Sequence, residues 1–354
     1  MNAYIFTPGP VKISDPILAI GGKQTPYFRN NEFSEILLDC EKFLLTIAKA
    51  PPGSRVVFLT GSGTAAMEAT VVNLLDSRDS PIVINGGGFG QRFVDICSFH
   101  CLKNINHHIK GTNLSDTNEL EHYSQSRALL VNGHETSVGI MYDLDAIGNF
   151  CQKHSLLHIV DAISMFITDE VDMVRQNIDA LIISSQKGLA LPPGLSMVIM
   201  APTALQKIKQ GKSYYFNFLP YLADGRRGQT PFTPAVTIIL QLHARLAQIV
   251  ADSVEAEIRK AKEIAEYFRS SIAGLPLRLF SRFMPNAMTA LSPTDGRKAY
   301  AIVQDLASGY NIFVAPNSGE LRDQVFRVSH MGDMTIPYVD VLIHALKQYY
   351  GVRG

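Results

Sequence analysis

Six short apolar runs occur in the first two thirds of the chain. They occupy residues 56–59, 82–84, 128–131, 156–160, 180–183 and 197–200. Continuous apolar runs of this length are typical of strands that are buried on both faces of a parallel sheet. Residues 65–75 and 144–154, which lie between such runs, show the spacing of apolar side chains that is typical of a helix. The alternation predicts repeated βαβ units and therefore an α/β domain.

The pattern changes after about residue 236, where longer stretches of helical periodicity begin. These stretches cover residues 237–249, 254–272 and 338–349, and mixed sequence separates the last two. We therefore expect a large domain over residues 16–250 and a smaller α+β domain over residues 251–354. We expect the N-terminal segment, residues 1–15, to join the smaller domain.

Composition and charge narrow the range of partners. Of the 354 residues, 46% are hydrophobic and 18% are charged, and 32 Lys and Arg balance 32 Asp and Glu. A chain without net charge has no global field that attracts nucleic acid or an anionic membrane. No apolar stretch approaches the roughly 20 residues that span a bilayer, and the N-terminus does not read as a secretory signal. We expect a cytoplasmic protein whose partners are small molecules or further copies of itself.

The four cysteines, Cys40, Cys97, Cys101 and Cys151, include no C-x-x-C pair. This spacing argues against a disulfide framework and against a zinc site. We expect no metal.

Three short segments carry candidate chemistry. Residues 61–64 (GSGT) follow one predicted strand and open a predicted helix, where backbone N–H groups favour an anion. Lys187 follows the predicted strand 180–183, and burial there would lower the pKa of its amine toward the nucleophilic form. Asp161 ends the run 156–160, at the sheet edge where ligands bind in α/β folds. Each of these segments, taken alone, also has an explanation without a functional role. The first could be a turn that binds nothing, Lys187 could be a solvated loop residue, and Asp161 could cap the segment that follows it.

Six motifs in order carry a resemblance to a known family. They are residues 61–64 (GSGT), 85–92 (NGGGFGQR), 134–139 (HETSVG), 160–164 (VDAIS), 184–188 (SSQKG) and 326–332 (FRVSHMG). Together they resemble the class V aminotransferases, nearest the alanine/serine–glyoxylate and 2-aminoethylphosphonate–pyruvate group. The resemblance runs from residue 7 to residue 332. It implies the PLP-dependent transferase fold type I, with a mostly parallel sheet in the large domain, and pyridoxal 5'-phosphate as cofactor.

The resemblance also implies a role for each matching residue. Lys187 would hold the cofactor as a Schiff base and move the proton during catalysis, and Asp161 would pair with the pyridinium nitrogen. Phe89 would stack on the ring, and Thr136 would contact its phenolic oxygen.

Further residues would hold the cofactor phosphate and the substrate. The phosphate ligands would be Ser62, Gly63, Thr64 and Gln186, with Thr233 reaching in from a neighbouring subunit. The active sites would therefore be shared within a homodimer. Arg327 would clamp the substrate carboxylate through paired hydrogen bonds, and Gly9 and Arg29 would also lie at the substrate.

Three positions depart from the pattern of the family. Thr230 stands where relatives often have tyrosine, Met165 where many have a small residue, and Phe28 where some have histidine. Substrate choice therefore remains open.

We expect an aminotransferase that moves an amino group from a small donor to a 2-oxo acid such as pyruvate or glyoxylate. One alternative is a 2-aminoethylphosphonate–pyruvate transaminase, for which Arg29 or Arg327 could bind the phosphonate. Another is a PLP-dependent lyase on the same fold, although a desulfurase needs a reactive cysteine late in the chain and none follows residue 151. A non-enzymatic PLP-binding protein is disfavoured because the expected Lys, Asp, Gln and Arg are all present.

Overall fold

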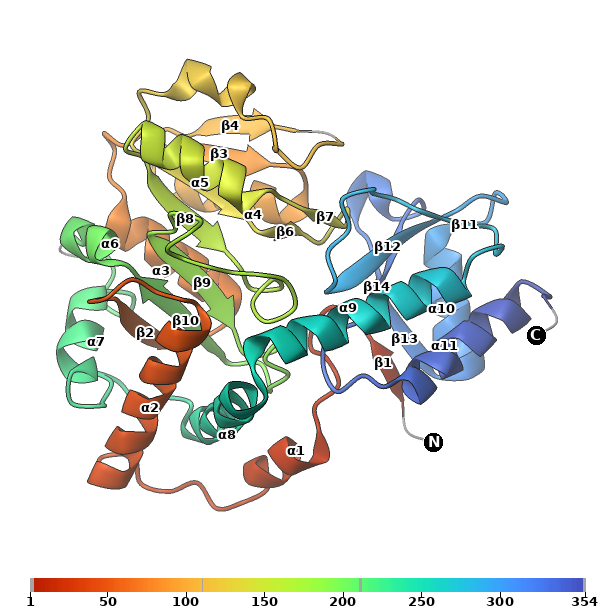
Figure 1. The fold of residues 1–354 in the computed structure, drawn as a ribbon, viewed down its shortest axis with the longest axis horizontal. Coiled ribbons are helices and arrows are strands. Elements are labelled where there is room, and N and C mark those ends of the chain that lie inside the picture. The colour runs from red at the N-terminus through yellow and green to blue at the C-terminus, as the bar shows by residue number, and fades with distance from the viewer. Residues whose placement is uncertain (1–2, 110, 210–211, 353–354) are drawn as a thin grey trace.

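A seven-stranded sheet and a five-stranded sheet, each with its own helices, lie side by side along the long axis of the molecule (Figure 1). The structure is a computed structural model that describes residues 3–109, 111–209 and 212–352. In this part of the chain, none of the helices combines the length and the apolar character that crossing a membrane requires.

The larger sheet contains all six strands that the apolar runs predict. In spatial order its strands are β2 (Arg55–Thr60), β10 (Leu195–Met200), β9 (Ala180–Ser184), β8 (Leu157–Asp161), β5 (Ala128–Asn132), β3 (Ile82–Asn85) and β4 (Ile105–His108). The pairs from β9 through β8, β5 and β3 to β4 are parallel. The prediction of a mostly parallel sheet is confirmed.

Two strands differ from what the apolar pattern predicts. β10 runs antiparallel to both β2 and β9, because the connection from β9 is a short loop without the crossover helix that a parallel pair needs. β4 was not predicted, because its sequence, Ile-Asn-His-His, is mostly polar. It lies at the edge of the sheet, where only one neighbouring strand covers it.

Helices cover both faces of the large sheet. Successive side chains of β2 alternate between two separate cores, Val56 and Phe58 in one and Val57 and Leu59 in the other. The first core contains side chains of α1 (Asp15–Gly21), α2 (Asn31–Ile47), α5 (Leu144–Lys153) and α8 (Val236–Asp252). The second contains side chains of α3 (Gly63–Leu74), α4 (Gly88–Phe99), α6 (Pro202–Lys207) and α7 (Phe218–Gly225). Burial on both faces explains why these strands are apolar throughout.

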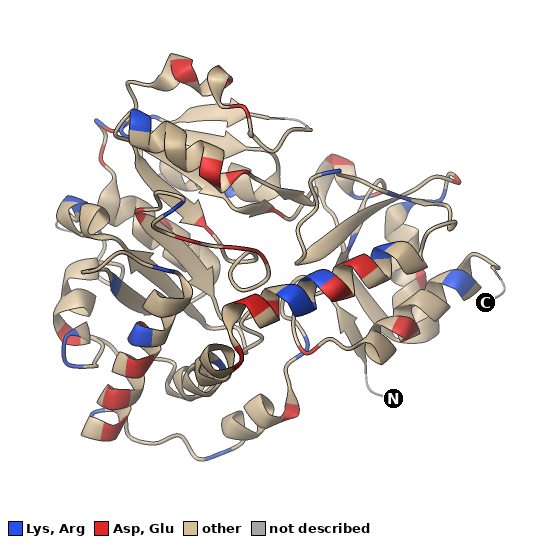
Figure 2. Ribbon diagram, in the orientation of Figure 1, with Lys and Arg blue, Asp and Glu red and all other residues tan. Residues whose placement is uncertain are grey.

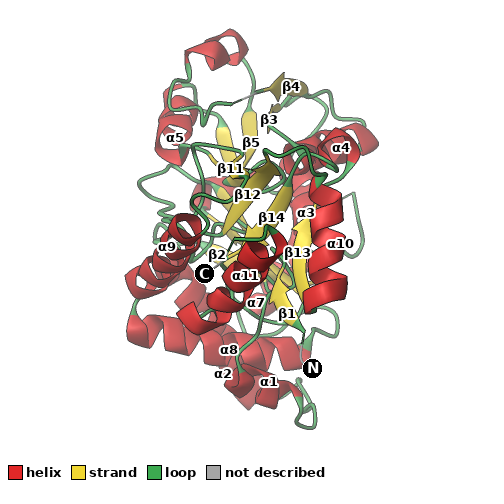
Figure 3. Cartoon of the chain, turned by 90° about the vertical axis from the view of Figure 1, so that its right-hand side faces the viewer, coloured by secondary structure: helices red, strands yellow, loops and turns green. Residues whose placement is uncertain are grey.

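The smaller sheet combines the C-terminal part of the chain with its N-terminal strand. Its strands are β1 (Tyr4–Phe6), β13 (Ile312–Pro316), β14 (Phe326–Ser329), β12 (Met288–Pro293) and β11 (Leu277–Leu279), in that order. Figures 1 and 3 show three helices gathered around it, α9 (Val254–Ser271), α10 (Ala299–Tyr310) and α11 (Ile336–Tyr349). β1 pairs in parallel with β13, so residues near the N-terminus are held by the C-terminal sheet.

The two halves meet where α8 ends and α9 begins. Ser253 separates these helices with a φ of 83°, and its hydroxyl accepts a hydrogen bond from the backbone N–H of Ala256. The expected boundary at 250/251 falls in the last turn of α8 and stays a prediction. Figure 2 shows basic and acidic residues alternating along α9 and scattered elsewhere, without a large patch of one sign on the face drawn.

A cluster of apolar residues joins the small sheet to the loop that follows β9. Its buried members are Val11, Ala190, Ala287, Met288, Ala290, Val325 and Met331. Ala190 comes from the β9–β10 loop, whereas Met288 and Ala290 come from β12. This contact fixes the loop that carries Lys187 against the smaller sheet.

We predict that Phe6→Ala destabilises the protein by about 3–5 kcal/mol, because a large, fully buried side chain would leave a cavity. Phe6 packs on Tyr338, with ring centroids 5.1 Å apart. The matched control is Phe313→Ala on the neighbouring strand, where the ring is 41% exposed and the expected change is within about 0.5 kcal/mol. Denaturant unfolding followed by tyrosine fluorescence measures both, and equal effects would contradict the placement of β1.

Candidate active site

A cavity of about 210 Å³ opens where β5, β8 and β9 end. Asn132 ends β5 and Asp161 ends β8, and the two are paired in the sheet register. The cavity is lined by Ser62, Gly63, Thr64, Met67, Phe89, Arg92, His134, Thr136, Asp161, Ile163, Ser164, Gln186 and Lys187. The carboxyl ends of parallel strands therefore bring together residues from five separate parts of the chain, as expected for a ligand site in an α/β fold.

Lys187 extends from the β9–β10 loop into the cavity, and its amine is surrounded by protein atoms. Nζ donates a hydrogen bond to the carbonyl oxygen of Pro8. Gly9 lies directly against it: with a φ of 130°, a Cβ at this position would be 2.8 Å from Nζ. The pKa of Lys187 is lowered to about 8: burial is the largest cause, the positive charge of Arg327 acts in the same direction, and the carboxylate of Asp161 opposes both. A much larger fraction of this amine is therefore neutral, and nucleophilic, near physiological pH than for a solvated lysine.

Asp161 is a buried carboxylate held by two donors. Oδ2 accepts a hydrogen bond of 2.6 Å from the side-chain amide of Asn132, and Oδ1 accepts one of 2.9 Å from the backbone N–H of Ile163. Burial nevertheless raises its pKa to about 6. A cation placed beside this group would offset that desolvation and favour the ionised carboxylate.

The opposite part of the cavity offers donors to an anion. The helix α3 begins at Gly63, and its N-cap hydroxyl, on Ser62, does not cap the helix. The first N–H groups of a helix lack intrahelical acceptors and attract negative charge. Arg92 adds a positive charge here, and its Nη1 donates to the hydroxyl of Thr64 over 3.1 Å. Gln186 accepts from Ser184 through its carbonyl oxygen, which leaves its amide nitrogen as a donor.

The residues present fit pyridoxal phosphate. A buried amine can bind an aldehyde, a buried carboxylate can pair with a ring nitrogen, and a helix N-terminus with an arginine can hold a phosphate. Phe89 supplies an aromatic face, and the guanidinium of Arg92 lies 5.0 Å from its ring centroid. Thr136 lines the same cavity.

Arg327 approaches this site from the smaller sheet, on β14. Nη2 donates to the carbonyl oxygen of Pro316 over 2.6 Å, whereas the buried Nε has no hydrogen-bond partner among the described residues. Arg327 also has no ion-pair partner in the described parts of the chain. A desolvated guanidinium without a paired carboxylate is suited to an anionic ligand.

Four of the expected site residues do not line this cavity. Gly9 lies against Lys187 and the charge of Arg327 acts on its amine, whereas Thr233 and Arg29 are exposed. Thr233 is exposed, in the segment that leads into α8. Arg29 is exposed and bound to the 229–230 segment, since Nη1 donates to the carbonyl oxygen of Thr230 over 2.8 Å and to the side chain of Gln229 over 3.2 Å. Thr230 itself is buried and donates to the carbonyl oxygen of Phe232.

Met165, which stands where many members of the family have a small residue, packs inside this chain. Its sulfur would lie 2.5 Å from a Cβ built on Gly133, so the buried methionine fills the space that a side chain at 133 would need. Met165 does not line the cavity.

Three residues of the site escaped the sequence reasoning. Arg92 lies three positions after Phe89 in the same helix, and that spacing places both on one face. Asn132 ends the strand beside Asp161. Glu135 is fully buried and accepts hydrogen bonds from the backbone N–H groups of Phe89 and Gly90, which fixes the start of α4. Both Arg92 and Glu135 lie inside recognised motifs, whereas the role of Asn132 depends on strand register.

Fold and site together define an enzyme of PLP fold type I. The family model for aminotransferase class-V matches residues 23–295, and the chain belongs to this family. It is therefore an aminotransferase-family enzyme with pyridoxal phosphate as cofactor. Among residues 3–109, 111–209 and 212–352, no group of three or more His, Cys, Asp or Glu side chains is placed to hold a metal ion.

Similar proteins extend over nearly the whole chain. The small subunit of a soluble hydrogenase from a Synechococcus strain is 28% identical over 94% of this chain and 88% of its own. The alanine–glyoxylate aminotransferase of Felis catus is 27% identical over 98% of this chain and 87% of its own. Among solved structures, an aspartate aminotransferase of Thermus thermophilus is 25% identical, with a TM-score of 0.87 over 98% of this chain and 99% of its own.

We predict that the amine of Lys187 titrates with a midpoint of about pH 8 in the cofactor-free protein, and that Arg327→Met raises the midpoint by removing a nearby positive charge. The rate at which an amine reagent labels the peptide containing Lys187, measured by mass spectrometry across pH, gives both values. Arg227→Met, which removes an exposed guanidinium bound to Asp224, is the control and should leave the midpoint unchanged. A wild-type midpoint near 10.5 would show that the amine is solvated.

Proposed function

We propose that this enzyme is a transaminase that moves an amino group from a small amino donor to a 2-oxo acid such as glyoxylate or pyruvate. The observation that carries the proposal is the arrangement around one buried amine. The charges of two groups act on the amine of Lys187: the carboxylate of Asp161, on the large sheet, and the guanidinium of Arg327, on the small sheet. That arrangement supplies a nucleophile, a counter-charge for a pyridinium and an anchor for a carboxylate.

Each of these side chains has a defined task in amino transfer. When bound, pyridoxal phosphate supplies an electron sink for the pair left at the substrate α-carbon. Nζ of Lys187 would hold the cofactor covalently and, once released by the incoming amine, would accept the proton from that carbon. Asp161 would keep the ring nitrogen protonated, since Asn132 and the backbone of Ile163 hold its carboxylate in place.

Arg327 would orient the substrate. A guanidinium can donate two parallel hydrogen bonds to a carboxylate, which fixes the plane of the substrate as well as its distance from Lys187. The free Nε, and the lack of an ion pair to Arg327 among the described residues, support this role. Gly9 would leave room beside Nζ, where a side chain would collide with the amine.

The names of similar proteins support a glyoxylate-type acceptor. Relatives include the alanine–glyoxylate aminotransferase of Felis catus, and an aspartate aminotransferase is among the solved structures. Alanine, serine and aspartate are therefore the first donors to test. A phosphonate donor remains the runner-up, with Arg29 or Arg327 as its anion contact.

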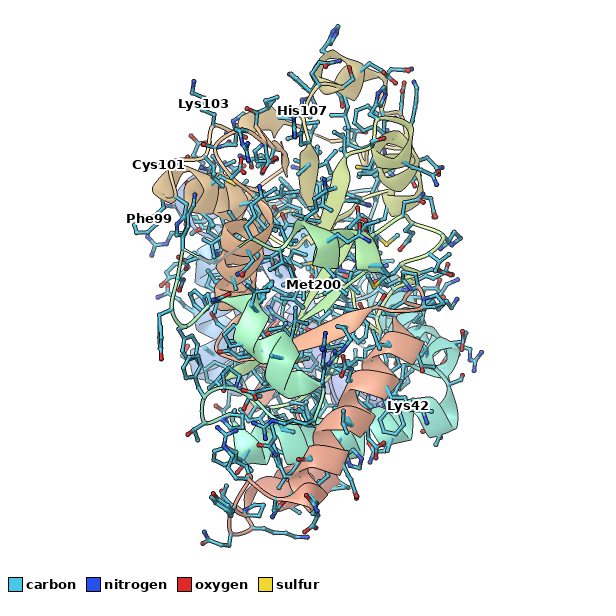
Figure 4. All side chains as sticks on the ribbon, turned by 90° about the vertical axis from the view of Figure 1, so that its left-hand side faces the viewer. Lys42, Phe99, Cys101, Lys103, His107 and Met200 are labelled. Carbon is cyan, nitrogen blue, oxygen red and sulfur yellow. The ribbon has the colours of Figure 1, made fainter. Side chains whose placement is uncertain are left out.

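A cysteine desulfurase, which needs a reactive cysteine, has less support from the chain. Three of the cysteines, Cys40, Cys97 and Cys151, are buried, and Cys101 is exposed. Figure 4 shows Cys101 on the outer surface near Phe99, and it does not line the cavity.

A homodimer with shared active sites completes the proposal. Thr233 is exposed and lies outside the cavity of its own chain, which is consistent with a contact to the phosphate site of a second copy. Cytoplasmic localisation stays a prediction from the sequence.

The experiment that tests the function is the visible absorption spectrum of the protein loaded with pyridoxal phosphate, before and after each donor. Loss of the visible band with one donor, and its return with glyoxylate or pyruvate, would establish amino transfer and identify both substrates. A band that none of alanine, serine, aspartate or 2-aminoethylphosphonate removes would count against the proposed donors. A protein that never becomes coloured would rule out the covalent role of Lys187.

We predict that Lys187→Ala abolishes the visible band and lowers the rate of amino transfer by at least about 10²–10⁴-fold, the range expected for losing a general acid–base group. The control is Lys42→Ala, which removes an exposed lysine on the outer side of α2 (Figure 4) and should leave the rate and the band unchanged. Steady-state assays at saturating substrate measure the difference. A near-normal rate in Lys187→Ala would assign catalysis to another group.

A further inference from the structure

Glu135 is a buried carboxylate that the proposed mechanism does not use. It lies in the short strand β6 (His134–Glu135), which pairs with β7 (Ile140–Met141), and it is 0% exposed. A carboxylate is costly to bury unless hydrogen bonds satisfy its oxygens. The groups that donate to Glu135 therefore indicate what this residue does.

Two of the donors are backbone groups in the first turn of α4. The N–H of Gly90 donates to Oε2 of Glu135 over 2.9 Å. The N–H of Phe89 donates to the same oxygen over 3.1 Å and to Oε1 over 3.3 Å. The residue before the helix is Gly87, which has no side chain that could accept from these groups. The carboxylate therefore caps α4 from another part of the chain.

Ser137 adds a further acceptor at the start of the same helix. Its hydroxyl donates to Oε1 of Glu135 and accepts from the backbone N–H of Gly88 over 3.0 Å. The two segments are in direct contact, because a Cβ on Gly87 would lie 2.3 Å from Oγ of Ser137 and 2.8 Å from Cδ of Glu135. Glu135 and Ser137 together therefore fix the first turn of α4.

This turn places the side chain of Phe89 at the cavity, which Asp161 and Lys187 also line. An aromatic ring stacks on a flat ligand only within a narrow range of distance and tilt, so a shift of the helix start would weaken such a contact. Glu135 itself does not line the cavity. An effect of Glu135 on a bound cofactor would therefore be indirect, through Phe89.

The other role open to Glu135 is that of a counter-charge for Arg327. Burial lowers the pKa of Arg327, and the charge of Glu135 acts in the opposite direction. Among the described residues, however, no ion pair joins these two side chains. The hydrogen bonds to Glu135 come from α4 and from Ser137, so the geometry favours the role of holding the helix.

We propose that Glu135 is a positioning residue that holds Phe89 against the bound cofactor by capping α4 from β6. It does not touch the cofactor, and its effect on cofactor binding passes through the ring of Phe89. That effect rests on the proposed function, which requires pyridoxal phosphate in this cavity, whereas the capping of α4 does not.

The cap is tested by amide hydrogen exchange in the cofactor-free protein, measured residue by residue in wild type and in Glu135→Leu. Leucine is similar in size to glutamate but cannot accept a hydrogen bond. We therefore expect the N–H groups of Phe89 and Gly90 to exchange about tenfold faster in the variant, as for one lost hydrogen bond to a charged group. Unchanged exchange at both positions would overturn the cap.

The matched control is Glu41→Leu, at a second buried glutamate that accepts a backbone N–H. Its carboxylate accepts from the N–H of Val56 over 2.9 Å and from Nε of Arg55 over 2.7 Å. It lies at the end of the large sheet opposite to the cavity, because Arg55 pairs through β10 with the start of β9. We expect this variant to leave exchange at Phe89 and Gly90 unchanged.

Glu135→Gln is measured if the leucine variant does not fold. Its amide has only one oxygen, so the NH₂ group must face either the N–H of Gly90, which donates to Oε2, or that of Ser137, which lies 3.2 Å from Oε1. We therefore expect faster exchange at one of these two positions, whichever way the amide lies. Wild-type exchange at both would overturn the cap equally.

The route through Phe89 is tested by a double-mutant cycle on the affinity for pyridoxal phosphate, measured by equilibrium dialysis. We expect the Glu135 variant that folds to bind about three- to tenfold more weakly than wild type, as for one misplaced aromatic contact. In Phe89→Ala, the same substitution should weaken binding by less than about twofold, because the ring that it displaces is already absent. Glu41→Leu should leave the affinity unchanged.

An unchanged affinity in the Glu135 variant, as a counter-charge for Arg327 alone would give, would overturn the proposal. An equal loss with and without the ring of Phe89 would also overturn it. A wild type that binds no pyridoxal phosphate would instead refute the proposed function, and the exchange measurement would still decide whether Glu135 caps α4.

Discussion

The chemistry that we propose for this enzyme depends on keeping one amine, that of Lys187, out of water. Lys187 lines the cavity together with Gln186 of the same β9–β10 loop, and burial is the main reason that the pKa of Lys187 falls to about 8. A fully solvated lysine would be protonated at neutral pH and would not attack an aldehyde. The fold must therefore surround this amine with protein and still leave space for a ligand beside it.

Both sheets contribute to that enclosure. The large sheet supplies the β9–β10 loop and the carboxylate of Asp161, while β1 of the small sheet leads into Pro8 and Gly9, which cover the amine. Arg327 adds a second cation from the small sheet, which acts on the pKa of the amine in the same direction as burial. The effect of these charges on Lys187 depends on how the two sheets are placed relative to each other. The hydrogen bond from the backbone N–H of Asn286 to Asp169 is one contact that fixes this placement.

Much of the fold followed from the sequence because its strands are buried on both faces. Such strands must be apolar throughout, so the apolar runs in the sequence predict their positions. The edge strand β4 is mostly polar, and no apolar run predicts it. The reversal of β10 depends on a loop too short for a crossover helix, which apolar periodicity does not reveal. Motifs that lie far apart in the sequence predict most of the residues that line the cavity, because loops at strand ends bring these motifs together.

What the sequence did not reveal depends on geometry across the chain. Asn132 contacts Asp161 only because of strand register, and Glu135 contacts the start of α4 only through the fold. Thr233 and Arg29 lie outside the cavity of their own chain, so their expected roles depend on a second copy or on the substrate. The spacing of residues along one chain carries no information about a second copy or about the substrate.

Reduction of the loaded protein tests most directly whether Lys187 carries the cofactor. Borohydride treatment of protein saturated with pyridoxal phosphate, followed by proteolysis and mass spectrometry, locates the covalently attached group. We expect stoichiometric attachment to the peptide containing Lys187 and none of comparable extent elsewhere. Attachment at another lysine, with Lys187 unmodified, would contradict the assignment of the cavity as the catalytic site.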